Sequence, residues 1–360
     1  MRVLNVNHSL DPTHGGGTAE RTFHVSRYLA RSGVECVLLT TDAGRGAERA
    51  RTLSDVKVVV LPLVSERFFV PRVSWRRLRE LVGSADIVHL MGHWTLLNAL
   101  VYWASRAQGK PYVVCPAGAL AIYGRSRALK RFYNAIVGKR IIRDARACIA
   151  ITPDEFVHFE AYGVERSRVV VIPNGISAED FERADAPAFR ARFGLAGHPF
   201  VLFMGRLDPI KGPDLLLRAF CRVQARFPDV HLVFAGPDSG MRDGLVETVR
   251  SHDLAARVHF TGSVAPQDKS SAYRAAMLLA IPSRHEAMSI VVLEGGISGI
   301  PVLLTDRCGF DVIDGRGAKV VEATEEALAQ GLAELLAAPE QLPAMGATLR
   351  AFTRETYQWQ

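Results

Sequence analysis

The stretch MLLAIPSRHEAMSIVVLEGGISGIPVLLTD, residues 277–306, contains a complete strand–helix–strand pattern. Its first run, MLLAIPS, is almost wholly apolar and leads into a polar loop, and Ser289 then stands where a helix would take its N-cap. Gly299 and Pro301 are residues that typically end a helix, and the apolar run IPVLLTD follows them. Apolar strands of this kind belong to parallel sheets that are covered on both faces. The stretch therefore predicts one βαβ unit.

The same alternation continues through both halves of the 360-residue chain, which is too long for one ordinary core. Further strand-like runs are RVLNVN, ECVLLTT, KVVVLPL, ADIVHLMG, PYVVCPAG, ACIAITP, FVLFMGRL, VHLVFAG and RVHFTG. Residues 171–199, rich in Pro and Gly, form a seam between two such series. We therefore predict an α/β fold with two doubly wound, Rossmann-like domains, residues 1–172 and 173–345, which face a central cleft.

The positive charge of the chain is concentrated in its first half. Residues 1–180 carry 25 Lys and Arg against 16 Asp and Glu, whereas residues 181–360 carry 19 against 21. The excess gathers in two helix-like segments, 72–80 and 125–146. Such segments suit an anionic membrane surface, an anionic acceptor or nucleic acid, and a merely solvated basic face is an equally good interpretation.

The composition indicates a globular protein in a reducing compartment. The five cysteines are odd in number and show no metal or redox spacing, and no apolar run approaches the ~18 residues of a membrane span. The first residues, MRVLNVNHSL, indicate a β-strand rather than a signal peptide. A cytoplasmic location is the resulting expectation.

Two loops that join a strand to a helix have the composition of anion sites. Gly15, Gly16 and Gly17 precede a helix, where the backbone can approach an anion and donate N–H groups to it. Arg206 and Lys211 flank the turn in MGRLDPIKG, before another helix, and two cations at a helix N-terminus can clamp a diphosphate. A flexible glycine loop and two solvated cations are the alternatives.

Glu286 and Glu294 first suggest a catalytic acid/base pair. An offset of eight residues on one helix would separate their Cα atoms by about 12 Å and their directions by about 80°. Paired carboxylates of glycosidases lie roughly 5–9.5 Å apart, so this pairing is a poor fit. With Glu286 in the loop and Glu294 in the helix, each would meet a different hydroxyl-rich part of one elongated ligand. Two structural carboxylates are the alternative.

Four motifs in order give these loops a specific resemblance. The run S-x-x-E-x₇-E-x₄-G-x-P-V, with GRLDPIKG upstream, VIPNGI at the seam and GGGTAE near the start, resembles the retaining glycosyltransferases of family 4, which have the GT-B fold. The matching motifs span residues 3 to 310. The resemblance also implies that the C-terminal segment, residues 346–360, packs back toward the first domain.

The resemblance assigns a role to each candidate residue. It implies that Glu286, Arg206 and Lys211 carry the reaction, with the two cations on the diphosphate and Glu286 on the hydroxyls of the transferred sugar. Glu294 would hold the ribose. The remaining donor contacts would come from Gly15, Gly16, Gly17, Val264, Lys269, Met288, Ser289 and Ile290, with Ser289 and Ile290 donating backbone N–H groups and with Val264 and Lys269 near the base. Acceptor contacts would come from His93, Ala117 and Gly118.

The implied activity is transfer of a hexose-type sugar, with retained configuration, from a UDP- or GDP-sugar to a glycan or a lipid-linked glycan. No D-x-D occurs in the chain, so neither a metal nor another cofactor is expected. Expected partners are the donor, the acceptor and the anionic inner face of the cytoplasmic membrane, reached through the basic helices, but not nucleic acid. Polysaccharide or lipopolysaccharide assembly in a bacterium fits this set.

The chain also departs from the family pattern. Ala287, Met288 and Ser289 follow the first glutamate where the family commonly has Gly-Phe-Gly, and Ala117 stands where related members often carry His or Arg. A nucleotide-sugar epimerase of the same fold, or a protein that binds the nucleotide sugar without transferring it, are the competing functions.

Overall fold

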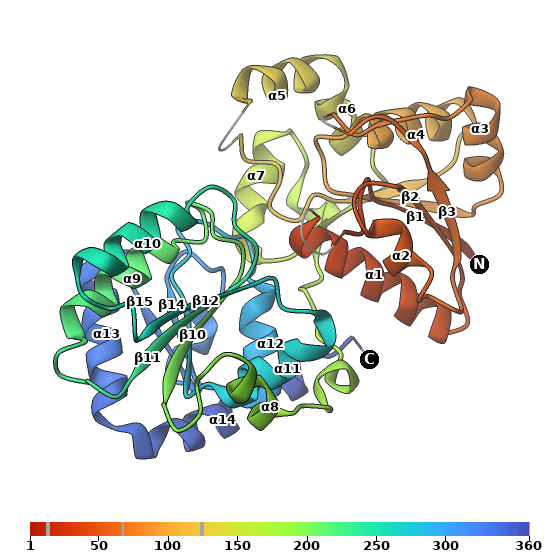
Figure 1. Cartoon of the computed structure of the whole chain (residues 1–360). Coiled ribbons are helices and arrows are strands. Elements are labelled where there is room, and N and C mark those ends of the chain that lie inside the picture. Colours follow the sequence, from red (N-terminus) through yellow and green to blue (C-terminus); the bar gives the residue numbers. More distant parts are fainter. Residues whose placement is uncertain (12–14, 67, 123–125, 360) are drawn as a thin grey trace. The chain divides into compact units, whose positions relative to one another are not determined.

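The computed structural model describes the chain except for residues 12–14, 67, 123–125 and 360. The described chain divides into two compact units (Figure 1). Unit 1 comprises Met1–Asn174 together with Trp359, and unit 2 comprises Gly175–Gln358. Each unit is a Rossmann-like α/β domain, and the GT-B fold class predicted from the sequence is confirmed.

Unit 1 is built on a parallel sheet with the strand order β3-β2-β1-β6-β7-β8-β9 in its described residues. These strands are Lys57–Leu61, Glu35–Thr41, Arg2–Val6, Ile87–Met91, Tyr112–Cys115, Ala147–Ala150 and Val169–Val171. The principal helices are α1 (Gly16–Arg31), α2 (Gly46–Ala50), α3 (Trp75–Gly83), α4 (Leu96–Ala107), α5 (Arg127–Tyr133), α6 (Lys139–Arg143) and α7 (Phe156–Ala161). A π-helical turn, Asn134–Gly138, joins α5 to α6, and β4 (Leu63–Ser65) pairs antiparallel with β5 (Val70–Pro71).

Strand β2 shows why both faces of this sheet are apolar. Cys36 and Leu38 pack with Phe23 of α1 in one core cluster, whereas Val37 and Leu39 belong to a second cluster on the opposite face. That second cluster also contains residues of α3, α4, α6 and α7. Since successive strand residues point to opposite faces, a strand covered on both sides must be apolar throughout.

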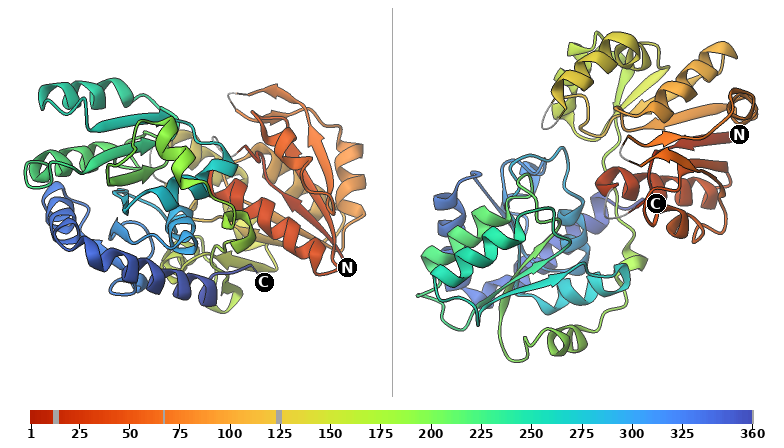
Figure 2. Two further views of the ribbon diagram at one scale, coloured as in Figure 1. Left: turned by 60° about the horizontal axis from the view of Figure 1, so that its bottom comes forward. Right: turned by 45° about the horizontal axis from the view of Figure 1, so that its top comes forward.

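Unit 2 repeats the plan with the strand order β12-β11-β10-β13-β14-β15 in its described residues. These strands are Val258–Gly262, His231–Ala235, Phe200–Met204, Leu278–Ile281, Val302–Thr305 and Ala318–Val321. The helices are α8 (Ala186–Arg192), α9 (Pro213–Val223), α10 (Arg242–Ser251), α11 (Pro266–Ala275), α12 (Ile290–Ser298), α13 (Glu325–Ala337) and α14 (Leu342–Thr356). They cover both faces of the sheet, with α9 beside α13 on one face and α12 beside α14 on the other (Figure 2).

The βαβ unit predicted for residues 277–306 is present as β13, α12 and β14. Helix α12 ends at Ser298, and Gly299 follows with a φ of 78°, the left-handed conformation that a glycine adopts most readily. Helix α14 begins before residue 346 and belongs to unit 2, and only the chain end groups with unit 1. There, the Trp359 ring lies 5.6 Å from the Arg21 guanidinium.

The strand order places a switch point in each sheet. In unit 2 the chain proceeds from β10 outward to β12 and then returns to β13 on the other side of β10. In unit 1 it proceeds from β1 to β3 and returns to β6 beside β1. Ligands of doubly wound sheets bind beyond the carboxyl ends of the strands at such points. The loops after β10 and β13, and those after β1 and β6, are therefore where a site is expected.

The described helices do not include one with the length and apolar character that crossing a membrane requires.

Candidate active site

The loops after β10 and β13 lie directly against each other in unit 2. Gly212, the N-cap of α9, has a φ of 68°, and a Cβ at this position would collide with the carbonyl oxygen of Pro282. Gly309 is similar, because a Cβ there would collide with the carbonyl oxygen of Ala287. These glycines allow three loops to approach more closely than other residues would permit.

Lys211 and Glu286, predicted to bind a diphosphate and a sugar, form an ion pair across these two loops. The Lys211 Nζ lies 2.7 Å from Glu286 Oε2, and the side chains are 23% and 12% exposed. The other carboxylate oxygen of Glu286 accepts a hydrogen bond from the Ser283 hydroxyl. The pair remains reachable from solvent, so a ligand can exchange partners with either member.

Arg206 is held at the mouth of the same turn by Asp208. An Arg206 guanidinium nitrogen lies 3.2 Å from Asp208 Oδ2. Asp208 Oδ1 accepts hydrogen bonds from the backbone N–H groups of Ile210 and Lys211, at 2.9 and 3.0 Å. Asp208 thus shapes the turn and orients Arg206 at the same time, and it leaves Arg206 half-exposed for an anion.

Glu294 sits deeper, on α12, and both of its carboxylate oxygens have partners. Oε1 lies 2.8 Å from Lys269 Nζ, and Oε2 accepts a hydrogen bond of 2.6 Å from the Tyr273 hydroxyl. Burial and the Glu294 charge raise the pKa of Tyr273 well above its usual value, so the tyrosine stays protonated as a donor. Lys269, predicted near a base, is therefore paired with the residue predicted to hold a ribose.

Tyr273 was not predicted as a site residue, although its spacing from Lys269 in the sequence indicated that the two side chains lie together. Lys269 and Tyr273 are four residues apart on α11, which places both on one face of the helix. A lysine and a tyrosine on one face of a helix are two hydrogen-bond donors that can meet one acceptor.

We expect Glu294→Gln to lower the free energy of unfolding by about 3 kcal/mol, because it leaves the Lys269 ammonium without its buried counter-charge. Urea unfolding of the full chain measures this change. Glu334→Gln is the matched control, since Glu334 pairs with Lys319 on the exposed surface of the same unit. Equal stability changes in the two variants would contradict the structural role of the Glu294 cluster.

The start of α12 differs in detail from the expected cap. Ser289 occupies the N-cap position, but its hydroxyl makes no capping bond, and its backbone N–H donates to the Cys308 carbonyl at 3.0 Å. The Ile290 and Val291 N–H groups, in the first helical turn, have no acceptor within the helix and can donate to an anion. The Ser289 N–H would have to leave the Cys308 carbonyl to do so, and the side chain of the preceding residue, Met288, is buried.

One of the expected donor residues, Val264, has no polar side chain, so a polar contact from it would come from its backbone. Val264 lies between β12 and α11, with its side chain partly exposed. The predicted role of Val264 near a base stays a prediction.

In unit 1, the glycine loop forms the start of α1 as predicted. Gly15 is the N-cap, and a Cβ there would lie 2.6 Å from the Ala19 Cβ and 2.8 Å from the Asp11 carbonyl oxygen. Gly16 has a φ of 54° in open surroundings, and Gly17 follows in the first turn. The backbone of this turn is thus accessible to a ligand, although residues 12–14 of the loop lie outside the described chain.

His93, predicted to meet an acceptor, lies inside unit 1 instead. It is 1% exposed, its Nε2 lies 3.1 Å from Asn134 Oδ1, and the rings of Trp94, Tyr133 and Tyr162 surround it. Burial lowers the pKa of His93 to about 4, so it is neutral at physiological pH. A direct contact with an acceptor would require this aromatic cluster to open.

Ala117 and Gly118 lie in the loop after β7. Ala117 has a φ of 50°, an unfavourable conformation for a residue with a Cβ, and Gly118 has a φ of 82°. The Gly118 N–H donates to Glu155 Oε1 at 2.6 Å, and the Ile151 N–H donates to Glu155 Oε2 at 2.6 Å. Glu155, which the sequence did not single out, therefore holds this loop in its strained conformation, as is common near ligand sites.

Two glycosyltransferase family models match this chain, one over most of each unit. Residues 16–175 match the model described as "Glycosyl transferase 4-like domain", and residues 185–351 match "Glycosyl transferases group 1". The fold is similar to that of a crystal structure of Anabaena Alr3699/HepE in complex with UDP-glucose, with a TM-score of 0.83, 19% identity, and coverage of 99% of this chain and 96% of that chain.

Curated relatives are named D-inositol 3-phosphate glycosyltransferase. The protein from Nocardia farcinica is 34% identical over 294 residues, which are 77% of this chain and 64% of that protein. The protein from Rhodococcus erythropolis is 32% identical over 309 residues, 81% of this chain and 69% of that protein. The chain thus spans slightly less than two thirds of the first of these relatives. On the family models and these relatives together, the chain belongs to the group 1 family of glycosyltransferases.

Proposed function

We propose that the chain transfers a hexose-type sugar from a nucleoside diphosphate sugar to a hydroxyl of an acceptor, with retention of configuration. The observation that carries this proposal is the Lys211–Glu286 pair at the switch point between β10 and β13. A cation and a carboxylate side by side match the phosphate and the hydroxyl-bearing ring of such a donor.

The chemistry follows from the charges at this point. Breaking the bond between the sugar and the diphosphate develops negative charge on the leaving phosphate. Lys211, Arg206 and the first N–H groups of α12 supply positive charge for it, so no metal is needed to carry the diphosphate. Glu286 accepts hydrogen bonds from the sugar, and Glu294 takes the ribose hydroxyls when these displace Lys269 or Tyr273. The departing phosphate can itself take up the proton of the acceptor hydroxyl, which attacks the sugar from the same face that the phosphate leaves.

The similar proteins suggest a first donor and one further acceptor to test. Anabaena Alr3699/HepE was crystallised with UDP-glucose, which supports a UDP-sugar as the first donor to try. The curated relatives are named for an inositol 3-phosphate acceptor, so this polyol phosphate joins glycans and lipid-linked glycans among the acceptors.

Acceptor-dependent release of nucleotide tests the proposal. The full chain is incubated with UDP- and GDP-sugars, with and without each acceptor, in the presence of EDTA. Release that needs an acceptor and persists in EDTA supports metal-independent transfer. Tight nucleotide-sugar binding without release would favour a binding protein, and interconversion of the sugar without transfer would favour an epimerase.

We also propose that unit 1 contacts an anionic membrane surface through residues 127–143, here called the basic helical surface. Leu129, Phe132 and Ile136 are exposed and recur at helical spacing along α5 and the π-helical turn. The cations of this surface are Arg127, Lys130, Arg131, Lys139, Arg140 and Arg143. Cations beside exposed apolar side chains are the combination that binds an anionic bilayer interface.

Flotation with vesicles of phosphatidylglycerol and phosphatidylcholine tests this surface. We expect Phe132→Ser to reduce the bound fraction several-fold, because Phe132 is 63% exposed and would enter the interface. Val312→Ser is the matched control, since Val312 in unit 2 is 61% exposed and lies outside the basic helical surface. No binding of the wild type at low salt, or equal loss in both variants, would refute the membrane proposal.

A further inference from the structure

Arg284 connects the loop after β13 to the loop after β10 more extensively than the Lys211–Glu286 pair does. Its backbone N–H donates to the Ile210 carbonyl at 2.7 Å, and its guanidinium donates to the Pro209 carbonyl at 2.8 Å. The same guanidinium reaches both carboxylate oxygens of Asp214, at 2.8 and 2.7 Å. Asp214 lies in the first turn of α9, so one side chain fixes the loop after β13 to both the neighbouring loop and its helix.

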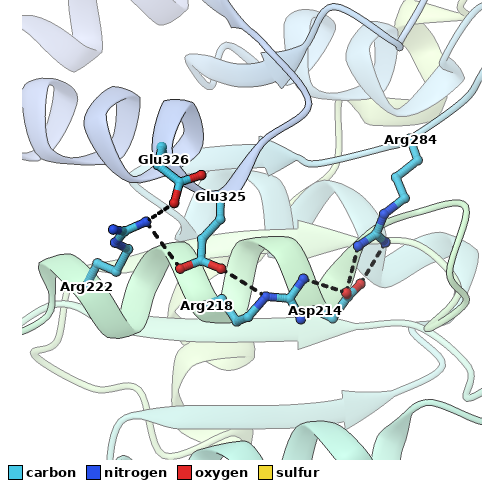
Figure 3. A network of polar contacts seen from close by, with 6 residues as sticks. All are labelled: Asp214, Arg218, Arg222, Arg284, Glu325 and Glu326. Atoms are coloured by element: carbon cyan, nitrogen blue, oxygen red, sulfur yellow. Dashed lines mark hydrogen bonds and ion pairs between the residues drawn. The ribbon is translucent and has the colours of Figure 1, made fainter.

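Asp214 is itself held from the opposite side, as Figure 3 shows. Arg218 lies 3.0 Å from Asp214 and 3.1 Å from Glu325 of α13. Arg222 pairs with Glu325 and Glu326, so the chain of alternating charges runs along α9 away from the site. Burial alone would raise the pKa of Asp214, but hydrogen bonds and charge from Arg284, together with those from Arg218, outweigh it and lower that pKa. Asp214 is therefore an ionised and anchored partner for Arg284.

The contacts of Arg284 lie close in sequence to Lys211 and Glu286, the two residues proposed to bind the donor. Ile210 precedes Lys211 directly, and Arg284 is two residues from Glu286. The Glu286 N–H is also fixed, since it donates to the Arg307 carbonyl at 2.8 Å. A guanidinium bound at both nitrogens to one carboxylate defines a direction as well as a distance. A shift of Arg284 would thus move Glu286 relative to Lys211.

We propose that Arg284 is a positioning residue that sets the separation of Glu286 and Lys211, and that it thereby couples recognition of the donor sugar to recognition of the diphosphate. This inference rests on the proposed function. Arg284 touches neither the sugar nor the phosphate in this account. It determines whether one donor can engage both side chains at once.

The test compares two conservative variants of the same network. Arg284→Lys keeps the charge but loses the two-point contact with Asp214. Arg222→Lys is the same substitution at the far end of the network, where one Arg222 nitrogen contacts Glu325 and Glu326 and no donor loop is contacted, and it is the matched control. Calorimetry on the full chain gives the affinities for UDP and UDP-glucose, and for GDP and GDP-mannose.

The contribution of the sugar to binding is measured by the ratio of the affinity for the nucleotide sugar to the affinity for the nucleotide alone. We expect Arg284→Lys to reduce this ratio about tenfold, since small displacements of positioning groups have effects of this size or larger. The affinity for UDP or GDP alone should change less than about twofold, because that affinity depends mainly on Lys211 and Arg206. Arg222→Lys should leave the ratio unchanged. A purely structural role would lower both affinities together, or affect both variants equally, and either result would overturn the inference.

A second measurement needs no ligand and separates this inference from the proposed function. The Arg284 and Glu286 N–H groups are both hydrogen-bonded across loops, so they are protected from exchange with solvent. We expect their hydrogen exchange to be about tenfold faster in Arg284→Lys and unchanged in Arg222→Lys. If wild type binds none of the four ligands, the proposed function is wrong, and so is the coupling that rests on it. The hydrogen-exchange result then decides by itself whether Arg284 positions the loop. Equal exchange in both variants would overturn the positioning role itself.

Discussion

Replacing Lys211 by Ala is expected to weaken binding of a nucleoside diphosphate about a hundredfold while changing nucleoside binding less than about twofold. The diphosphate loses a charge-assisted contact with the Nζ, which lies at the mouth of α9 and 2.7 Å from Glu286. The nucleoside has no group that reaches this charge. Calorimetric titrations of the full chain with UDP, GDP, uridine and guanosine measure both affinities.

The control for Lys211→Ala is Lys319→Ala in the same unit. Lys319 also forms an ion pair with a glutamate, Glu334, but it lies on β15 and the pair is exposed. This variant should bind every ligand as wild type does. Equal weakening of diphosphate and nucleoside binding in Lys211→Ala would show that the variant disturbs the unit as a whole rather than a phosphate contact.

Replacing Glu286 by Gln is expected to lower turnover about a hundredfold without weakening binding of UDP or GDP. Gln keeps the shape of the side chain, but hydrogen bonds from sugar hydroxyls to a neutral amide oxygen are weaker than those to a carboxylate. Lys211 at the same time loses its intramolecular counter-charge, so its pairing with a diphosphate should be maintained or improved. Acceptor-dependent nucleotide release and calorimetry on the same preparation measure the two effects.

Glu322→Gln serves as the control for this variant, because Glu322 is exposed in unit 2 between β15 and α13. It should leave both turnover and nucleotide affinity unchanged. A Glu286→Gln variant with wild-type turnover would contradict the role given to the carboxylate. Loss of nucleotide binding would instead show that Glu286 stabilises the folded conformation of the loop.

Features that depend on local patterns were predictable from the sequence. The apolar runs gave the strands, Gly299 ended α12 as expected, and the order of runs led to two doubly wound sheets. The two loops with Arg206, Lys211 and Glu286 could be placed as well, because strand ends in such sheets share one edge. The glycine loop before α1 was found for the same reason.

Features that depend on which side chains meet across elements were not predictable. Arg284 and Asp214 are 70 residues apart, and their contact arises only because β10 and β13 are neighbours in the sheet. His93 looked like a residue at an open strand end, yet Asn134 and three aromatic rings enclose it. Such pairings follow from tertiary packing, for which a single sequence carries no local signal.

Equilibrium binding of UDP-glucose and GDP-mannose to wild type and to the double variant Lys211→Ala/Glu286→Gln tests the proposed donor site most directly. In the proposed function, both side chains contact one donor in unit 2. We therefore expect wild type to bind at least one of the two nucleotide sugars, and the double variant to bind it at least about a hundredfold more weakly while unfolding at a similar urea concentration. Undiminished binding in the folded double variant would show that the donor is held elsewhere and would contradict the roles proposed for Lys211 and Glu286.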